Sequence, residues 1–184
     1  MNTYQLVLVA LGASIIAVLA QVSIPLPPLP VPITGQTLAI GLVVTILGTK
    51  LGTLSVLLYI LLGAIGLPVF AQFKSGLSVL VGPTGGFIVG FIPTALLIGL
   101  ILEKTSYNYA MATVANVVGM CVTLAFGVIW LKYGAELTWA KALAAGVTPF
   151  IIPGLLKAAL ASWVGIIVRK RLQSAQSLSF QKSS

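Results

Sequence analysis

The chain lacks the side chains on which most catalytic and metal sites depend. Its 184 residues include no His, and the two acidic residues, Glu103 and Glu136, are both glutamates. Metal sites are built from His, Cys and carboxylates, and proton relays inside membranes use carboxylates or imidazoles. We therefore expect no metal, no cofactor and no catalytic residue, and we predict that the chain is not an enzyme.

Cysteine and nucleotide-binding motifs are equally scarce. Cys121 is the only cysteine, so an intramolecular disulfide is excluded, and its apolar neighbours favour a packing role. The glycine-rich stretch 82–86 continues with Phe87, where a phosphate loop requires a Lys-Ser or Lys-Thr pair. Any uphill transport must therefore draw its energy from another polypeptide.

Hydrophobic residues make up 59% of the chain and charged residues only 7%, with a mean hydropathy of +1.14. Such a composition is typical of membrane proteins. A helix that crosses the hydrocarbon core needs roughly 20 apolar residues, so the length suffices for about six spans and little else. We predict an all-α integral membrane protein with six transmembrane helices in one domain, residues 1–184, ending in a flexible tail, residues 172–184.

Six apolar runs can be assigned to these spans. The second and third are separated only by Thr49 and Lys50, which predicts a tight helical hairpin, and the second covers only about 20 Å. The first run follows no basic leader, so we expect it to be retained as a span. In chain order the runs are Leu6–Val22, Gln36–Gly48, Leu51–Leu67, 84–102, Tyr109–Leu131 and Ala142–Val168.

Two irregular segments interrupt the apolar pattern. Residues 23–32 contain five prolines and should form a stiff, extended, apolar loop. Residues 66–86 are broken repeatedly by glycine and proline. Irregular backbone at membrane depth is tolerated only where it is buried in protein or lines a cavity, so these segments predict a binding pocket.

The net charge is +8, from ten Lys and Arg against two Glu. The cations are scattered between apolar runs, which argues against nucleic-acid binding and for membrane orientation. With an even number of spans, the positive-inside rule places both termini in the cytoplasm and both irregular loops outside the cytoplasmic membrane. The inner side then holds Lys50, Lys104, Arg169, Lys170, Arg171 and Lys182, and the outer side holds Lys74, Lys132 and Lys141.

Lys157 is the first candidate for a ligand site. It lies within the last apolar run, about 18 Å along the helix from Arg169. A buried ammonium needs a partner, and a bound anion or the polar groups of a ligand would supply one. The alternative is that Lys157 reaches the outer interface, since Pro153 starts the helix only one turn away.

Other candidate residues also have structural alternatives. The amide of Asn116 could recognise a cyclic urea or bond to a neighbouring helix. Thr84 and Gly85 could present a helix N-terminus to a ligand or serve helix entry and packing. Small residues at helical spacing on the first span allow a close helix contact, inside the bundle or with a second subunit. They are Ala10, Ala13, Ala17 and Ala20.

Three motifs occur in the first half of the chain: Pro32-Ile33-Thr34-Gly35-Gln36-Thr37-Leu38, then 62–71 (LGAIGLPVFA), and 82–91 (GPTGGFIVGF). Together they closely resemble the BioY family, the biotin-binding S components of energy-coupling-factor (ECF) transporters. The likeness in length and segment order extends over nearly the whole chain. It implies an S-component-like six-helix bundle whose vitamin site lies near the outer surface under the first and third connecting loops.

The resemblance also implies a function and partners. Biotin would be captured from outside, with its rings against Phe70 and Phe73. Its polar contacts would come from Lys157, Asn116, Thr84, Gly85 and Gln36. A transmembrane coupling protein and two cytoplasmic ATPase subunits would assemble with the chain in the bilayer, docking in part on Ala13 and Ala17.

One position departs from that family pattern. Relatives commonly have an acidic residue three positions before the last-helix lysine, where this chain has Gly154, so the polar contacts of that half of the site need another source.

One functional alternative stays open. It is a channel for a small solute or ion, with the two irregular loops as re-entrant segments and Lys157 as an electrostatic filter.

Overall fold

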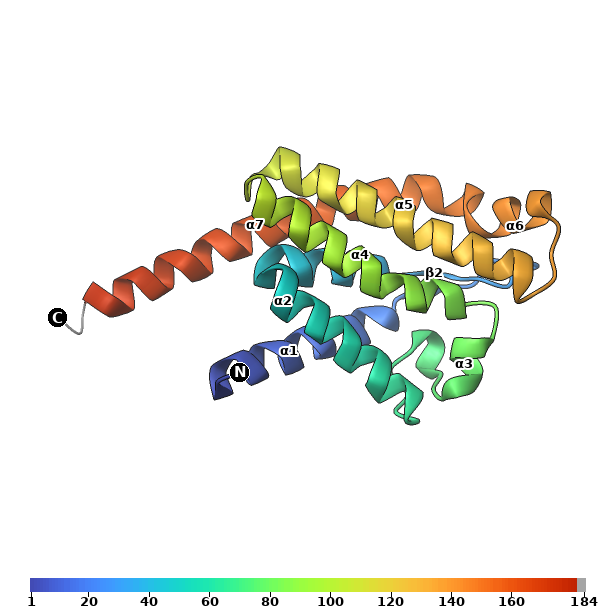
Figure 1. Cartoon of the computed structure of the whole chain (residues 1–184), viewed down its shortest axis with the longest axis horizontal. Helices are drawn as coiled ribbons and strands as arrows, with labels where there is room; N and C mark the ends of the chain where they lie inside the picture. Colours follow the sequence, from blue (N-terminus) through green and yellow to red (C-terminus); the bar gives the residue numbers. More distant parts are fainter. Residues whose placement is uncertain (182–184) are drawn as a thin grey trace.

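The computed structural model describes the backbone of residues 1–181 and the side chains of residues 1–174. Lys182 therefore lies outside the described part, and of the tail expected to be flexible, residues 172–184, the side chains are described only to residue 174. Apolar helices dominate the fold (Figure 1). The long ones are α1 (Thr3–Ala20), α2 (Gln36–Ala64), α4 (Gly85–Lys104), α5 (Tyr109–Tyr133) and α7 (Ile151–Gln181), and the short ones are α3 (Leu77–Val81) and α6 (Trp139–Gly146).

Helix α2 reverses direction at Gly48, which makes it two helices rather than one. Gly48 has φ 81° and ψ −176°, a backbone conformation outside the helical region. The two arms then pack against each other, since a Cβ added at Gly52 would lie 2.8 Å from the Cα of Val44. Glu103 stabilises the turn by accepting a hydrogen bond from the Thr49 amide at 2.9 Å. The hairpin expected around Thr49 and Lys50 is thus confirmed, although its turn is centred one residue earlier.

Six apolar helical segments cross the bundle in the described part of the chain. Five helical stretches are long and apolar enough to span a membrane, the last running from Trp139 to Ser174, and α2 contributes two arms. The last stretch contains α6, a 3₁₀ turn η2 (Thr148–Phe150) and α7. Pro153 lies in the first turn of α7, where a proline costs no hydrogen bond. The prediction of an all-α, multi-pass membrane protein with six helices is confirmed.

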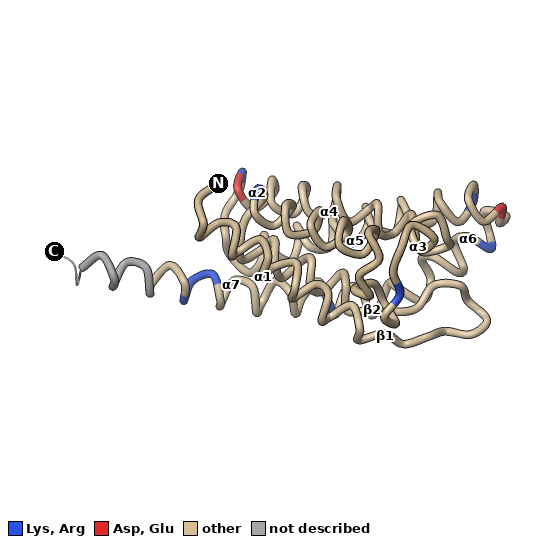
Figure 2. The backbone as a smooth tube through the Cα atoms, turned by 90° about the horizontal axis from the view of Figure 1, so that it is seen from below, with Lys and Arg blue, Asp and Glu red and all other residues tan. Residues whose placement is uncertain are grey.

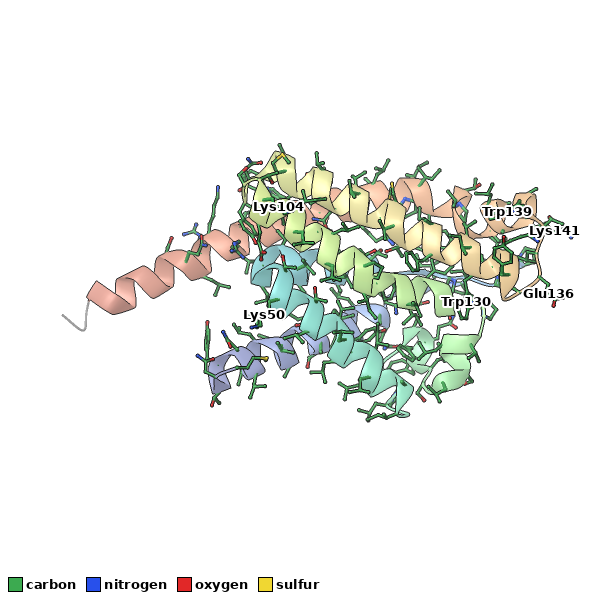
Figure 3. The ribbon with its side chains drawn as sticks, in the orientation of Figure 1. Lys50, Lys104, Trp130, Glu136, Trp139 and Lys141 are labelled. Atoms are coloured by element: carbon green, nitrogen blue, oxygen red, sulfur yellow. The ribbon has the colours of Figure 1, made fainter. Side chains whose placement is uncertain are left out.

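The two ends of the bundle differ in charge and in structure. Both termini lie toward one end, and the irregular segments lie toward the other (Figure 1). Charged residues lie mainly toward these two ends of the backbone, with few between them (Figure 2). Figure 3 shows Lys50 and Lys104 toward the end of the termini, and Glu136, Trp139 and Lys141 at the opposite end.

The irregular segments contain short elements that the sequence did not predict. The proline-rich segment leaves and returns through two antiparallel strands, β1 (Ser23–Ile24) and β2 (Ile33–Thr34), with Ser23 opposite Thr34. The later segment contains a 3₁₀ turn, η1 (Ala71–Phe73), as well as α3. Elements this short have no detectable hydrophobic period, so composition alone gave only irregular backbone.

Close packing between helices relies on small residues and local polar bonds. Glycines on α4 let α5 approach, because a Cβ at Gly86 would overlap Trp130 and one at Gly90 would lie 2.8 Å from the Cβ of Phe126. Thr94 donates a 3.0 Å hydrogen bond to the carbonyl of Gly119 on α5. Such contacts replace the hydrophobic driving force that is missing between helices in lipid. They give the site a rigid frame.

We predict that Gly48→Ala destabilises the fold. The φ and ψ of Gly48 fall in a region that is essentially restricted to glycine, where another residue costs about 1–3 kcal/mol. We expect the apparent melting temperature in detergent to fall by about 3 °C or more. Lys50→Ala, at an exposed position in the same turn, is the matched control and should melt like the wild type. An unchanged melting temperature for Gly48→Ala would contradict this account of the turn.

Candidate functional site

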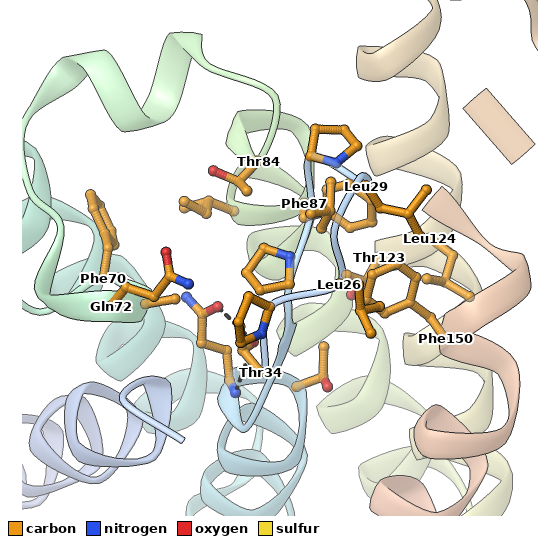
Figure 4. A pocket seen from close by; sticks show the side chains of 18 of the residues that line it. Leu26, Leu29, Thr34, Phe70, Gln72, Thr84, Phe87, Thr123, Leu124 and Phe150 are labelled. Carbon is orange, nitrogen blue, oxygen red and sulfur yellow. Dashed lines mark hydrogen bonds between the residues drawn. The ribbon is translucent and has the colours of Figure 1, made fainter. Parts of the chain in front are cut away.

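A cavity of about 440 Å³ is lined by both irregular segments, which lie toward the end of the bundle opposite the termini (Figure 1). The proline-rich segment, the loop after α2 and the helices α4, α5 and α7 all contribute to its lining (Figure 4). A volume of this size is typical of pockets for small organic ligands. Both irregular segments that suggested a pocket in the sequence therefore meet at one cavity.

The proline-rich segment, residues 25–32, forms one wall. All eight of its residues line the cavity, and the β1–β2 pairing closes the segment at its base. Prolines have no amide hydrogen to satisfy. With five prolines among its eight residues, the wall has few amide donors that need a partner, so irregular backbone can border an apolar site here.

The loop after α2 forms the facing wall. Phe70 is only 1% exposed and packs edge-on against Tyr59 of α2, with ring centroids 5.7 Å apart. Gly63 makes room for it, because a Cβ there would overlap the Phe70 ring. Ala71 and Gln72 follow Phe70 along the lining. A glycine on the helix and an aromatic residue on the loop thus fix this wall together.

Aromatic and aliphatic side chains complete the apolar part of the site. Phe87 on α4 and Phe150 just before α7 face each other with ring centroids 6.0 Å apart. Phe91, Met120 and Leu124 add further apolar surface. A flat or bicyclic apolar group could be held between these side chains and Phe70.

A chain of hydrogen bonds forms the polar edge of the cavity. The Nζ of Lys157 donates to the backbone oxygen of Thr34 at 3.0 Å. The Thr34 hydroxyl donates to Oε1 of Gln36 at 2.8 Å, and Nε2 of Gln36 donates to the Tyr59 hydroxyl at 2.7 Å. These bonds connect α7, β2 and α2. Each side chain at this edge is therefore held in position before any ligand arrives.

The charge of the lining is positive. Lys157 and Lys74 both border the cavity, and neither Glu103 nor Glu136 is among the lining residues. The bond to the Thr34 carbonyl leaves the ammonium of Lys157 with further donor capacity, since an ammonium has three N–H groups. Apolar walls with a cation at one edge suit a ligand that combines an apolar ring system with an anionic group.

Four of the predicted ligand-binding residues come together at this cavity. Lys157, Gln36, Thr84 and Phe70 all belong to its lining, although they come from two helices, the turn before α4 and the loop after α2. Lys157 is partly buried within the bundle, bonded to a backbone oxygen. It borders the cavity instead of extending freely toward the outer interface.

The other three predicted residues lie outside the lining. Asn116 is 5% exposed, and its Nδ2 donates to the Ala112 oxygen at 2.9 Å and to the Ser162 hydroxyl at 3.1 Å. It borders a second space of only about 20 Å³ beneath Lys157. A Cβ at Gly85 would overlap the Leu80 carbonyl, which indicates close packing. Phe73 is 70% exposed.

The two predicted docking residues of α1, Ala13 and Ala17, are both at least partly buried in the bundle. Ala13 is 2% exposed, and Ala17 is partly buried against the same core. Next to them, Gly12 lies tightly against α2, since a Cβ there would be 3.0 Å from Cγ1 of Val43. The small residues on the exposed face of α1 are Ala10 and Ser14.

Sequence reasoning missed several residues that shape the site. Gln21, at the end of α1, bonds to the loop that bears Phe70. Gln72 lines the cavity from that loop, and Met120 lines it from α5. A polar residue at the end of an apolar run was a usable signal for Gln21, because such residues need a partner. No sequence pattern indicated Met120, since whether it lines the cavity depends on how α5 is rotated about its axis.

Comparison with known proteins agrees with this architecture. The BioY family model matches residues 1–174. Biotin transporter BioY2 of Lactococcus lactis is 43% identical over 169 residues, covering 92% of each chain. Biotin transporter BioY of Thermotoga maritima is 42% identical over 166 residues, covering 90% of this chain and 96% of the relative.

A solved structure shares the fold. The crystal structure of the S-component for biotin from an ECF-type ABC transporter superposes with a TM-score of 0.85 at 29% sequence identity. The match covers 92% of this chain and 95% of that one. With family match, relatives and fold in agreement, the chain is a member of the BioY family.

Proposed function

We propose that this chain captures biotin and delivers it across the cytoplasmic membrane as the substrate-binding subunit of an ATP-driven ECF importer. The observation behind the proposal is the cavity of about 440 Å³, whose apolar walls end at Lys157, in a chain whose relatives are biotin transporters. Biotin combines a fused bicyclic ring with a carboxylate on a short alkyl arm. Both parts have matching surfaces in this site.

In this proposal the apolar and polar halves of the cavity hold different parts of biotin. The fused rings lie between Phe70 and the aromatic group of Phe87 and Phe91. The carboxylate pairs with the ammonium of Lys157, and the ureido group bonds to polar lining residues such as Thr84 and Gln36. Asn116, Gly85 and Phe73 have no direct contact in this arrangement, because they lie outside the lining.

The proposed orientation places the cavity outside and both termini in the cytoplasm. Of the described cations, Lys50 and Lys104 lie toward the end of the termini and Lys141 at the opposite end (Figure 3). Arg169, Lys170 and Arg171 follow in the C-terminal part of α7, whereas Lys132 lies in the last turn of α5 and Lys74 borders the cavity. The excess at the end of the termini matches the positive-inside rule. Biotin then enters from outside.

Delivery requires partners in this proposal, because the sequence has no motif for binding ATP. A transmembrane coupling protein and two cytoplasmic ATPase subunits would supply the energy and reorient the subunit. The fold similarity to an S-component from an ECF-type ABC transporter supports such an assembly. The subunit itself acts as a binding protein within the bilayer and not as an enzyme.

A channel is less consistent with the packing beneath the cavity. The space next to Lys157 has a volume of only about 20 Å³, and the amide of Asn116 there bonds to Thr45 of α2 and to Ser162 of α7. A polar pore would need a continuous wet path. Saturable retention of labelled biotin by the purified protein supports capture, whereas ligand-independent flux through the protein in liposomes would support a pore.

We predict that Lys157→Met weakens biotin binding by about tenfold to a hundredfold. This is the range expected for one hydrogen bond to a charged group. Biotin methyl ester, which lacks the carboxylate charge, should bind the wild type less tightly than biotin, but Lys157→Met should bind both alike. The affinities can be measured by isothermal titration calorimetry of purified protein in detergent.

Lys141→Ala is the control for this experiment. Lys141 is exposed at the same end of the bundle and does not line the cavity. It should therefore retain the affinity of the wild type for both ligands. Equal biotin affinities for the wild type and Lys157→Met would remove Lys157 from the proposed site. If Lys157→Met binds biotin more weakly but still binds it more tightly than the ester, another group must pair with the biotin carboxylate.

The proposed orientation can be tested with single cysteines in a Cys121→Ser background. Lys74→Cys should react from outside with a membrane-impermeant maleimide in right-side-out vesicles, and biotin should slow that reaction because residue 74 borders the cavity. Lys50→Cys, exposed at the end of the termini, should react only after the vesicles are permeabilised. The opposite labelling pattern would invert the assigned topology.

A further inference from the structure

The side chain of Gln21 connects the end of α1 to the cavity wall formed by the loop after α2. Gln21 caps α1, and its Nε2 lies 3.2 Å from the oxygen of Val69 and 3.1 Å from that of Phe70. Its Oε1 accepts a hydrogen bond from the amide of Phe73 at 2.9 Å. Both ends of the Gln21 amide therefore bind the backbone of residues 69–73, which we call the clamped loop.

The clamped loop is strained where Gln21 holds it. Gln72 and Phe73 have φ values of 60° and 55°, and neither is a glycine. Left-handed backbone costs a non-glycine residue of order 1–3 kcal/mol and persists only where surrounding contacts enforce it. The bond from the Phe73 amide to Gln21 is one such contact, so the loop should relax when it is lost.

The position of the clamped loop determines the shape of the cavity. Phe70, Ala71 and Gln72 all line it (Figure 4). Gln21 also lies just before the start of the proline-rich wall, and the Gly35 amide donates to the Val22 oxygen at 2.8 Å. The two facing walls of the cavity are thus both attached at the C-terminal end of α1, one through the chain and one through Gln21.

We propose that Gln21 is a positioning residue for ligand retention, whose side-chain amide holds the clamped loop against the cavity. The inference rests on the proposed capture of biotin and adds to it. Gln21 does not line the cavity, so it acts through the loop and not by touching the ligand. Loss of its bonds should mainly raise the rate at which bound biotin leaves.

The first test measures biotin release from purified full-length protein in detergent. Gln21→Met keeps the approximate size and removes the hydrogen bonds, and Gln21→Glu keeps an acceptor for the Phe73 amide but removes the donors to Val69 and Phe70. We expect dissociation of labelled biotin to be about tenfold faster in both variants, as for the loss of one or two net hydrogen bonds. Ser14→Ala is the control, because this exposed α1 hydroxyl bonds only within its own helix.

The second test observes the loop without any ligand. A spin label on Phe73→Cys, in a Cys121→Ser background, should become more mobile when Gln21→Met is added and should not respond to Ser14→Ala. A purely structural role would lower the fraction of active protein but leave the release rate of bound biotin unchanged. Should Gln21→Met fail to fold, the same two readouts on Gln21→Glu decide the question.

The outcomes separate this inference from the proposed function. Wild-type protein that retains biotin, with unchanged release and unchanged label mobility in the Gln21 variants, overturns the inference alone. Wild-type protein that does not bind biotin overturns the proposed function, while the label still reports whether Gln21 holds the loop. Faster release together with a more mobile label supports both.

Discussion

The bond between the ammonium of Lys157 and the backbone oxygen of Thr34 connects the parts of the site that come from opposite ends of the chain. A cation within a membrane-spanning helix needs a polar partner, because the surrounding lipid offers none. Here the partner is a carbonyl in β2, at the base of the proline-rich wall. Hydrogen bonds from Thr34 to Gln36 and from Gln36 to Tyr59 extend this polar edge to a buried residue of α2. Moving any of these groups would shift the others.

Irregular backbone near lipid needs hydrogen-bond partners for its polar main-chain groups, and the two walls of the cavity meet this need in different ways. The proline-rich wall has few amide hydrogens, and its ends pair as two short strands. The clamped loop uses the side chain of Gln21 instead. Two solutions to one physical problem thus lie on facing sides of the cavity, and each leaves side chains free to line it.

The sequence predicted what depends on composition and order. The apolar runs predicted six helices and one hairpin, and the two proline- or glycine-rich segments predicted where the cavity lies. The isolated Lys157 indicated the polar edge of that cavity. The sequence could not predict which way side chains point. Asn116 faces Thr45 of α2 and Ser162 of α7, and Gly85 packs on Leu80, because the rotation of each helix is set by its neighbours. Strands β1 and β2 were too short to leave a pattern.

The departure at Gly154 has a structural counterpart. A Cβ at this position would overlap the sulfur of Met120, which lines the cavity from α5. The space that the acidic side chain expected from the family pattern would need is therefore occupied by an apolar one. Since neither glutamate of the chain lines the cavity, Lys157 has no carboxylate there to neutralise it. Its charge stays available to a bound anion, which is the condition that the proposed recognition of a carboxylate requires.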